Sequence, residues 1–236
     1  MESDRGRIDS IRAFLERHAL RVQNLELILQ ALTHRSYAFE NAEIPDNERL
    51  EFLGDSVLGS LASDFLYRQF PTDSEGVLSK KKGFLVSRRE LALRAESLGL
   101  GELVLLGKGE EHSGGRDRAS ITGSALEALI GALYYEVPFE SLREFVWDTV
   151  LSPGLAGLQS EVHLDYKSRL QELVQKSRQV VPIYKKIREV GPAHSRSFVV
   201  EVFVDGACLG TGEGSRIKTA ENRAARQAYE RLLHQS

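Results

Sequence analysis

The chain of 236 residues has only one cysteine, one methionine and one tryptophan. Its single cysteine, Cys208, excludes an internal disulfide and is typical of proteins from a reducing compartment. No run approaches the roughly 18 consecutive apolar residues of a membrane-spanning helix, and the charged N-terminus lacks the apolar centre of a secretory signal. We therefore expect a cytoplasmic protein with no membrane partner.

The chain also lacks a net basic charge, because its formal charge is −3 at pH 7. That balance hides an asymmetry between its two parts. From His163 onward there are 13 Lys and Arg against 8 Asp and Glu, whereas the preceding part has 18 against 26. A basic module joined to an acidic one predicts that the C-terminal part binds a polyanion and that the N-terminal part collects cations.

Helical periodicity runs through most of the first 152 residues. Apolar residues recur at spacings of three and four, as at Ile8, Ile11, Phe14 and Leu15, and no run alternates like a strand. We predict an all-α domain over residues 1–152, with helices at 87–97, 124–135 and 139–150 among others. Pro153, Gly154 and Gly157 then predict a linker over residues 153–162.

The remaining residues, 163–236, show a different pattern. A helix at 166–176 precedes three predicted strands at 182–190, 197–204 and 207–213, and a helix at 219–233 closes the chain. The pair Asp205-Gly206 is typical of a two-residue hairpin turn. We expect a small α+β domain with the order α-β-β-β-α.

Three carboxylates, Glu48, Glu51 and Asp55, share one face if residues 48–55 are helical. Glu51 and Asp55 would lie about 6 Å apart along the axis, where like charges raise each other's pKa unless a cation lies between them. Hard oxygen ligands on a rigid helix suit Mg²⁺. A solvated acidic face is the alternative, but such faces usually interleave lysines four residues away, and this one does not.

The run from Asn47 to Leu58, NERLEFLGDSVL, resembles the signature of the bacterial ribonuclease III family, which are endonucleases specific for double-stranded RNA. Residues 32–37, 106–111, 113–116 and 127–132 are similar to further segments of that family, and residues 163–236 resemble a double-stranded-RNA-binding domain. The resemblance implies an all-α endonuclease domain followed by a small α+β RNA-binding domain.

The resemblance also implies roles for acidic residues. It implies that Asp55 and Glu127 are catalytic, and that Glu51, Asp55 and Glu127 bind Mg²⁺, with Mn²⁺ as a substitute. Carboxylates of two helices would then meet around the scissile phosphate in a two-metal hydrolysis. Glu48 would position RNA or the partner's site, and Glu75 would lie near a cleft related by the dimer.

One position departs from the family pattern, because Ser124 stands where the family carries a metal-binding aspartate. A neutral hydroxyl is a weak Mg²⁺ ligand, so the enzyme could need more metal, cut slowly or selectively, or only bind RNA. As another interpretation, Gly123-Ser124 could be the N-terminal cap of the second acidic helix.

Phe52 has two interpretations. In an apolar helix it could fill the core, whereas the matching aromatic of the family inserts into a second subunit. Because one catalytic valley cuts one strand, a symmetric dimer is needed to cut both strands of a duplex. The resemblance therefore implies a homodimer that leaves 5′-phosphates and staggered 3′-hydroxyl ends.

Duplex RNA is recognised by its shape, its 2′-hydroxyls and its phosphates. Three regions of residues 163–236 resemble the RNA-contacting surfaces of such domains. In the last of them Arg216 and Ile217 replace the family's usual serine and one lysine, so we expect the affinity for RNA to be shifted. The residues that match the family's RNA contacts are Gln171, Glu172, His194, Ser215, Arg216 and Lys218.

We thus expect a Mg²⁺-dependent endoribonuclease that processes structured transcripts, such as ribosomal and messenger RNA precursors. The alternative is a double-stranded-RNA-binding regulator whose cleavage is weakened or lost through Ser124. A nucleotide cofactor is not expected, because Gly107-Lys108-Gly109 lacks the following Lys-Ser/Thr of a phosphate-binding loop.

Overall fold

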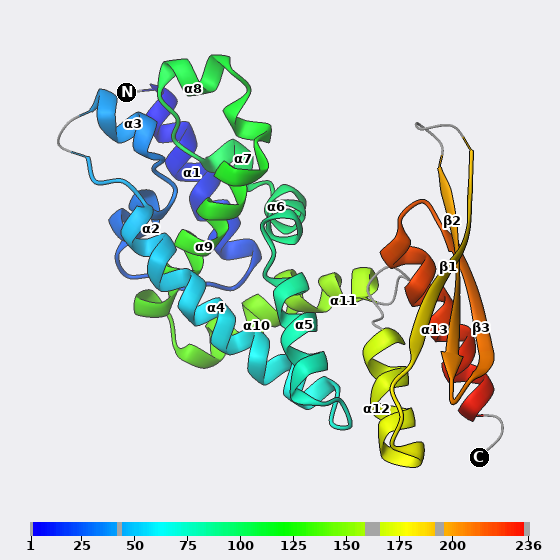
Figure 1. The fold of residues 1–236 in the computed structure, drawn as a ribbon. Coiled ribbons are helices and arrows are strands. Elements are labelled where there is room, and N and C mark those ends of the chain that lie inside the picture. Colours follow the sequence, from blue (N-terminus) through cyan, green and yellow to red (C-terminus); the bar gives the residue numbers. More distant parts are fainter. Residues whose placement is uncertain (1, 42–43, 159–165, 192–195, 234–236) are drawn as a thin grey trace. The chain divides into compact units, whose positions relative to one another are not determined.

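The computed structural model describes residues 2–41, 44–158, 166–191 and 196–233 (Figure 1). The chain divides into two compact units, Met1–Leu158 and Gln159–Ser236. The first is helical, and the second has the order α-β-β-β-α, so the fold class predicted from the sequence is confirmed. In the described part of the chain, no helix has the length and apolar character needed to cross a lipid bilayer.

The first unit is built from short and medium helices joined by tight turns. A 3₁₀ turn, Gly115–Asp117, precedes α9, and a π-helical turn, Trp147–Leu151, joins α10 to α11. The helices are α1 Glu2–Arg17, α2 Leu25–Ala31, α3 Arg35–Glu40, α4 Glu48–Gln69, α5 Glu75–Leu85, α6 Arg88–Ser97, α7 Leu100–Leu103, α8 Lys108–His112, α9 Ala119–Glu136, α10 Phe139–Val146 and α11 Ser152–Leu158.

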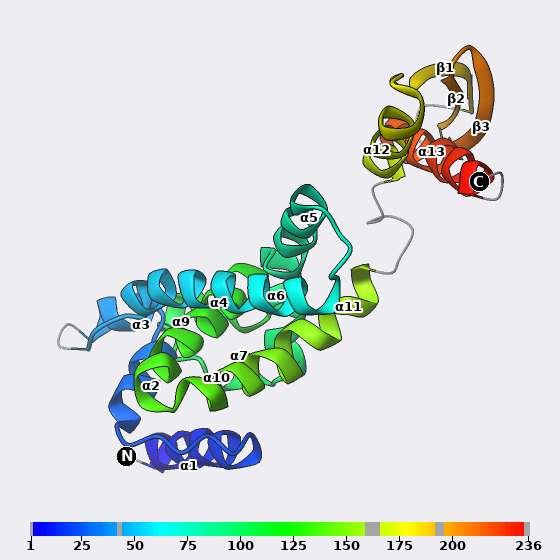
Figure 2. The same ribbon diagram turned by 90° about the horizontal axis from the view of Figure 1, so that it is seen from below.

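Helix α9 is the centre of this unit. Helices α2, α4, α6 and α10 pack around it (Figures 1 and 2). From Ile121 to Leu133, every residue is buried except Ser124 and Glu127. A helix enclosed on all sides is expected to be apolar all round. Ser124 and Glu127, three positions apart on one face of this helix, therefore mark its candidate functional face.

Two boundaries differ from the sequence-based prediction. Helix α9 begins at Ala119, five residues before Ser124, so the interpretation of Ser124 as an N-terminal cap is wrong. The linker expected over residues 153–162 is helical up to Leu158, because α11 continues from the π-helical turn and buries Gly154 and Leu158. Residues 159–162 of that linker lie outside the described residues.

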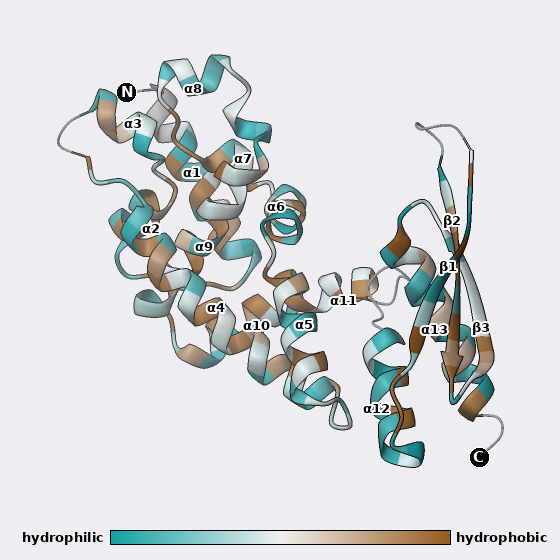
Figure 3. Cartoon of the chain, viewed as in Figure 1, coloured by the Kyte–Doolittle hydropathy of each residue, from teal (hydrophilic) through white to brown (hydrophobic). Residues whose placement is uncertain are grey.

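The second unit has one antiparallel sheet in the order β1-β2-β3, with α12 and α13 on the same face (Figure 2). Val202 and Val204 point from β2 into its core, and Val200 is buried as well. The apolar side of α12 faces α13 and the sheet (Figure 3). Asp205 and Gly206, at φ of 52° and 77°, form the predicted hairpin turn. The elements are α12 Tyr166–Arg178, β1 Ile183–Val190, β2 Ser197–Val204, β3 Ala207–Gly214 and α13 Ile217–Leu233.

Candidate active site

Helices α4 and α9 touch backbone to backbone at two glycines. A Cβ atom built on Gly54 would lie 1.7 Å from the carbonyl oxygen of Glu127, and one on Gly131 would lie 2.2 Å from that of Leu50. Only glycine permits so close an approach. The crossing therefore brings the acidic stretch of α4, with Glu51 and Asp55, against the polar stripe of α9.

Ser124 and Glu51 meet across this crossing. The Ser124 hydroxyl donates a hydrogen bond of 2.8 Å to Oε1 of Glu51, and both side chains are half-buried. The two residues are 73 positions apart in the chain. The structure thus brings together one residue from each of the two acidic helices predicted from the sequence.

Glu127 lies in the same electrostatic environment. Burial and, after it, the carboxylates of Asp55 and Glu51 raise the pKa of Glu127 from its usual value to about 7. Arg88, at the start of α6, lowers it in part. Arg88 is a neighbour of the site that the sequence analysis missed, because only the packing of α6 against α9 near Gly123 brings it there.

The donor set suits a hard divalent cation. In the described ranges, no group of three His, Cys, Asp or Glu side chains already converges closely enough to hold a metal ion. Nevertheless, the carboxylates of Asp55 and Glu51 add to the effect of burial in raising the pKa of Glu127, and a bound cation would relieve this repulsion. These oxygen donors fit Mg²⁺ better than a softer metal.

Glu48 and Phe52 belong to the first two turns of α4 and line a hollow that the three carboxylates do not line. Glu48 pairs with Arg35 at 3.6 Å and shares a surface hollow of about 640 Å³ with Phe52 and Tyr135. The Phe52 side chain is 79% exposed, so the interpretation of Phe52 as core filler is wrong. An exposed aromatic beside a hollow is typical of a contact surface.

Glu75 lies in a different place. It is the first residue of α5, its carboxylate accepts a hydrogen bond of 2.7 Å from Ser79, and it lines a hollow with Asp64 and Tyr67 of α4. Asp64 is nine residues after Asp55, which is about 13 Å along the helix axis. The hollow that Glu75 lines is therefore at the opposite end of α4 from Glu48.

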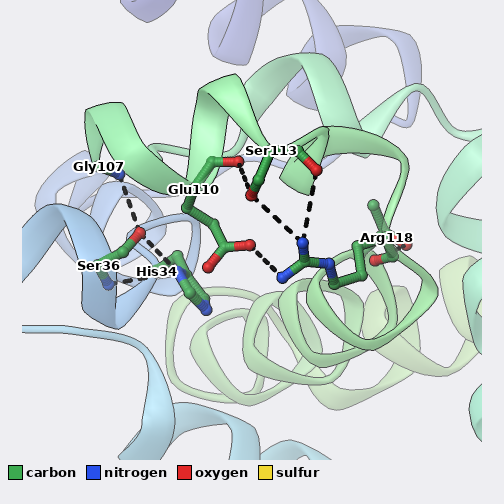
Figure 4. Close-up of polar contacts among 7 residues, drawn as sticks. His34, Ser36, Gly107, Glu110, Ser113 and Arg118 are labelled. Atoms are coloured by element: carbon green, nitrogen blue, oxygen red, sulfur yellow. Dashed lines mark hydrogen bonds and ion pairs between the residues drawn. The ribbon is translucent and has the colours of Figure 1, made fainter.

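The loops beside the acidic helices are joined by hydrogen bonds (Figure 4). His34 caps α3, and its Nδ1 lies 2.8 Å from the Ser36 hydroxyl, which accepts a hydrogen bond of 2.9 Å from the Gly107 N–H. The His34 N–H donates to the Leu105 carbonyl at 3.0 Å. Two segments that resemble family motifs, residues 32–37 and 106–111, thus form one unit.

Two arginines connect this loop to the start of α9. Arg118 pairs with Glu110 and donates to the Ser113 hydroxyl at 3.3 Å (Figure 4). Arg116 forms a two-pronged ion pair with Glu111 at 2.5 and 2.6 Å and also donates to the Gly101 carbonyl. These contacts fix the N-terminus of α9 and, with it, the positions of Ser124 and Glu127 along the site.

The RNA-contact residues predicted in the second unit are exposed where the structure describes them. Gln171 and Glu172 lie on α12, whereas Ser215, Arg216 and Lys218 surround the N-terminus of α13. A helix N-terminus carries partial positive charge and favours phosphate. His194 lies outside the described residues.

Neighbouring contacts hold these two helices in register. Lys167 of α12 pairs with Glu221 of α13 at 2.7 Å, and the Tyr166 N–H donates to Asn222 at 2.8 Å. Arg223, one turn into α13, donates to the Glu213 carbonyl at 2.7 Å. Its guanidinium is therefore already bonded to β3.

The sequence and fold match known families. A family model described as "Ribonuclease-III-like" matches residues 24–153, and the model "Double-stranded RNA binding motif" matches residues 166–232. The chain is similar to Ribonuclease 3 of Bacillus cytotoxicus, with 42% identity over 97% of this chain and 94% of that protein. It is similar to Ribonuclease 3 of Anoxybacillus flavithermus, with 44% identity over 93% and 92% of the two chains.

A solved structure agrees with this. The nuclease domain of ribonuclease III from Campylobacter jejuni superposes with a TM-score of 0.56 and 36% identity, covering 61% of this chain and 95% of that one. Another structure of that domain, whose title concerns flexibility in the region of dimer formation, gives a TM-score of 0.55 and covers 59% and 94%. The chain therefore belongs to the ribonuclease III family: it is a double-strand-specific endoribonuclease with a helical nuclease domain and a double-stranded-RNA-binding domain.

Proposed function

We propose that this endoribonuclease depends on Mg²⁺, accepts Mn²⁺ as a substitute, and hydrolyses phosphodiester bonds of both strands of duplex RNA. Its products would carry 5′-phosphates and staggered 3′-hydroxyl ends. We propose structured transcripts, such as ribosomal and messenger RNA precursors, as its substrates. Because the curated relatives come from bacteria, we place its activity in the bacterial cytoplasm, where such transcripts are made.

One observation carries the proposed site. Glu51 and Asp55 of α4 face Glu127 of α9 across the glycine crossing. Burial of Glu127, and after it these two carboxylates, raise the pKa of Glu127 to about 7. Glu51 and Glu127 are half-buried and Asp55 is exposed, and holding three acidic groups this close costs free energy unless a cation compensates for their charge. Such a concentration of negative charge is typical of sites that bind a divalent metal ion.

The residues divide the chemistry among them. Bound divalent ions supply a reactive water near neutral pH and charge stabilisation for the leaving 3′ oxygen. We assign Asp55 and Glu127 as the catalytic carboxylates and Glu51 as a further metal ligand. With a pKa of about 7, Glu127 must lose its proton before it can serve as an anionic ligand. Glu48, at the start of α4, and Glu75, at the start of α5, would border the path of the RNA.

The second unit holds the substrate in this proposal. Domains of this kind span about 16 base pairs with little sequence preference. Gln171 and Glu172 would reach one minor groove, His194 the next, and the cluster of Ser215, Arg216 and Lys218 the phosphates between them. The exposed start of α13 supports the last assignment, since three polar or basic side chains surround a positive helix end.

We further propose that the enzyme is a homodimer in which Phe52 inserts into the partner subunit. The 79% exposure of the Phe52 side chain supports this, because a phenyl ring exposed to water is unfavourable. Two copies would also give one catalytic valley for each strand of the duplex.

The second candidate is an RNA-binding regulator with weakened or lost cleavage. Ser124 favours it, because a hydroxyl replaces an anionic ligand of the family and donates to Glu51. The proximity of Glu51, Asp55 and Glu127 favours the nuclease, since all three acidic groups remain in place.

A cleavage assay separates the two candidates. End-labelled duplex RNA is incubated with wild type, Glu127→Gln and Glu144→Gln across Mg²⁺ and Mn²⁺ titrations, and RNA binding is measured by mobility shift. Glu144 is an exposed carboxylate of α10 and serves as the matched control. We expect Glu127→Gln to abolish cutting and keep binding, with Glu144→Gln unchanged. Unchanged cutting by Glu127→Gln would refute the site assignment, and no metal-supported cutting by wild type would favour the regulator.

A further inference from the structure

The hydroxyl of Ser124 has a specific partner. At the helix crossing, it donates a hydrogen bond of 2.8 Å to Oε1 of Glu51. Thr122, two residues earlier, instead donates to the carbonyl of Arg118, four residues back in its own helix, at 3.4 Å. Serine and threonine inside helices usually make the second kind of bond. Ser124 directs its hydrogen to another helix.

Local structure gives no other reason for a serine here. Helix α9 starts at Ala119, so Ser124 is in its second turn and caps nothing. Its neighbours Gly123 and Ala125 are buried, and alanine is the better helix former at an interior position. The polar group in this buried stretch therefore acts through the residue it touches.

Glu51 needs such a partner. A glutamate has three rotatable side-chain bonds, and fixing them in one orientation costs conformational entropy. A hydrogen bond to a charged group is stronger than one between neutral groups, so a single hydroxyl can select one orientation of the carboxylate. A carboxylate already oriented binds a cation without that ordering cost.

We propose that Ser124 is a positioning residue: its hydroxyl orients Glu51 for the divalent cation and adds no charge of its own. This inference rests on the proposed function and deepens it. The cation is then held by the carboxylates of Glu51, Asp55 and Glu127, and Ser124 acts on it through Glu51.

This arrangement differs physically from one with an aspartate at position 124. A second carboxylate there would lie within hydrogen-bond distance of Glu51, where two like charges repel without a cation. Ser124→Asp should therefore make the metal-free protein less stable and the metal-bound protein more stable. Serine gives a site that is oriented before the metal arrives, whereas aspartate gives one that the metal must assemble.

The test uses the full chain with Ser124→Ala, Ser124→Thr, Ser124→Asn and Ser124→Asp. Mg²⁺ affinity is measured by calorimetry without RNA, and melting temperature is measured with and without Mg²⁺. A double-mutant cycle of Ser124→Ala with Glu51→Ala is measured by thermal unfolding in chelator. It gives the contribution to stability of the coupling between the two side chains in the absence of metal.

We expect Ser124→Ala to weaken Mg²⁺ binding about five- to tenfold, because a hydrogen bond to a charged group is lost. Threonine or asparagine, which keep a donor, should restore the affinity to within about twofold. The cycle should show that the two substitutions are not additive. Ser124→Asp should melt below wild type in chelator and gain more from Mg²⁺, since binding only to the folded state stabilises it.

Wild-type affinity in Ser124→Ala, or failure of both Thr and Asn to restore binding, would overturn the proposal while leaving the nuclease assignment intact. Additivity in the metal-free cycle would overturn it as well. If wild type bound no Mg²⁺ and cut no RNA, the proposed function itself would fail, and this inference with it.

Discussion

Gly54 and Glu127 are in backbone contact, and a single methyl group on Gly54 would lie 1.7 Å from the Glu127 carbonyl oxygen. The separation between the two acidic helices is therefore set by the absence of a side chain. The interactions of Glu51 and Asp55 with Ser124 and Glu127 depend on this distance.

Gly54→Ala should accordingly force α4 and α9 apart. We expect a loss of about 3 kcal/mol or more in the free energy of unfolding, since overpacking against backbone cannot relax through a rotamer change. RNA cutting should fall with it. Denaturant unfolding of Gly54→Ala and Gly59→Ala checks this.

Gly59 lies on the same helix with nothing within 4 Å of its would-be Cβ. Alanine there should be neutral or stabilise the protein by about 0.5–1 kcal/mol. Equal effects at both positions would show that the helix crossing is not the cause.

The pKa of Glu127 gives a pH dependence in metal-free buffer. The folded-state pKa is about 7, above the ordinary value of 4.5, so the folded protein binds more protons than the unfolded chain between these values. Stability should be highest below about pH 4.5, as far as this group is concerned, and should decline as pH rises toward 7. We expect a decline of a few degrees in Tm, reduced by the partial exposure of the group.

Glu127→Gln cannot ionise and should lack this part of the decline. The measurement is the difference in Tm between wild type and Glu127→Gln across that pH range, in chelator. A difference that stays constant with pH would contradict a raised pKa at Glu127.

Arg88 places a positive charge beside the acidic cluster. Since it repels a cation, Arg88→Gln should tighten Mg²⁺ binding well above the pKa of Glu127, by about two- to fivefold for an exposed charge. Calorimetry at low salt measures this. Arg89→Gln, the adjacent exposed arginine, is the control and should change the affinity less. Equal effects would indicate a general surface charge effect.

Phe52 tests the proposed dimer. Phe52→Asp should convert a dimer into a monomer and reduce RNA cutting, because a charge replaces the apolar group that the partner would cover. Sedimentation velocity measures the mass. Ile187→Asp, at an exposed apolar position of the RNA-binding domain, should leave the mass unchanged. A Phe52→Asp protein with wild-type mass would contradict the proposed role of this side chain.

The start of α13 tests the RNA contacts. Arg216→Ala combined with Lys218→Ala should weaken binding of duplexes of any sequence, and each lost phosphate contact should reduce the salt dependence of log Kd by about 1. Arg223→Ala is the control, because its guanidinium already bonds to the Glu213 carbonyl. Salt-dependent binding curves of the three proteins decide the point.

The sequence alone determined the fold class and most of the secondary structure, although α9 begins five residues before Ser124 and the expected linker is helical up to Leu158. The strand Ser197–Val204 follows from side-chain alternation, and the hairpin at Asp205-Gly206 follows from turn chemistry, because both signals act between near neighbours. The face shared by Glu51 and Asp55 follows from helical geometry in the same way. The resemblance to a family then indicated that the helix containing Glu127 pairs with this acidic face.

Only the tertiary structure decided how these elements meet. The bond from Ser124 to Glu51 joins residues 73 positions apart, the charge of Arg88 arrives from a third helix, and the exposure of Phe52 depends on what packs beside α4. Periodicity predicts which face of a helix is apolar, but not which helix covers it or how closely. Here that distance is set by two glycines, whose effect exists only where two backbones touch.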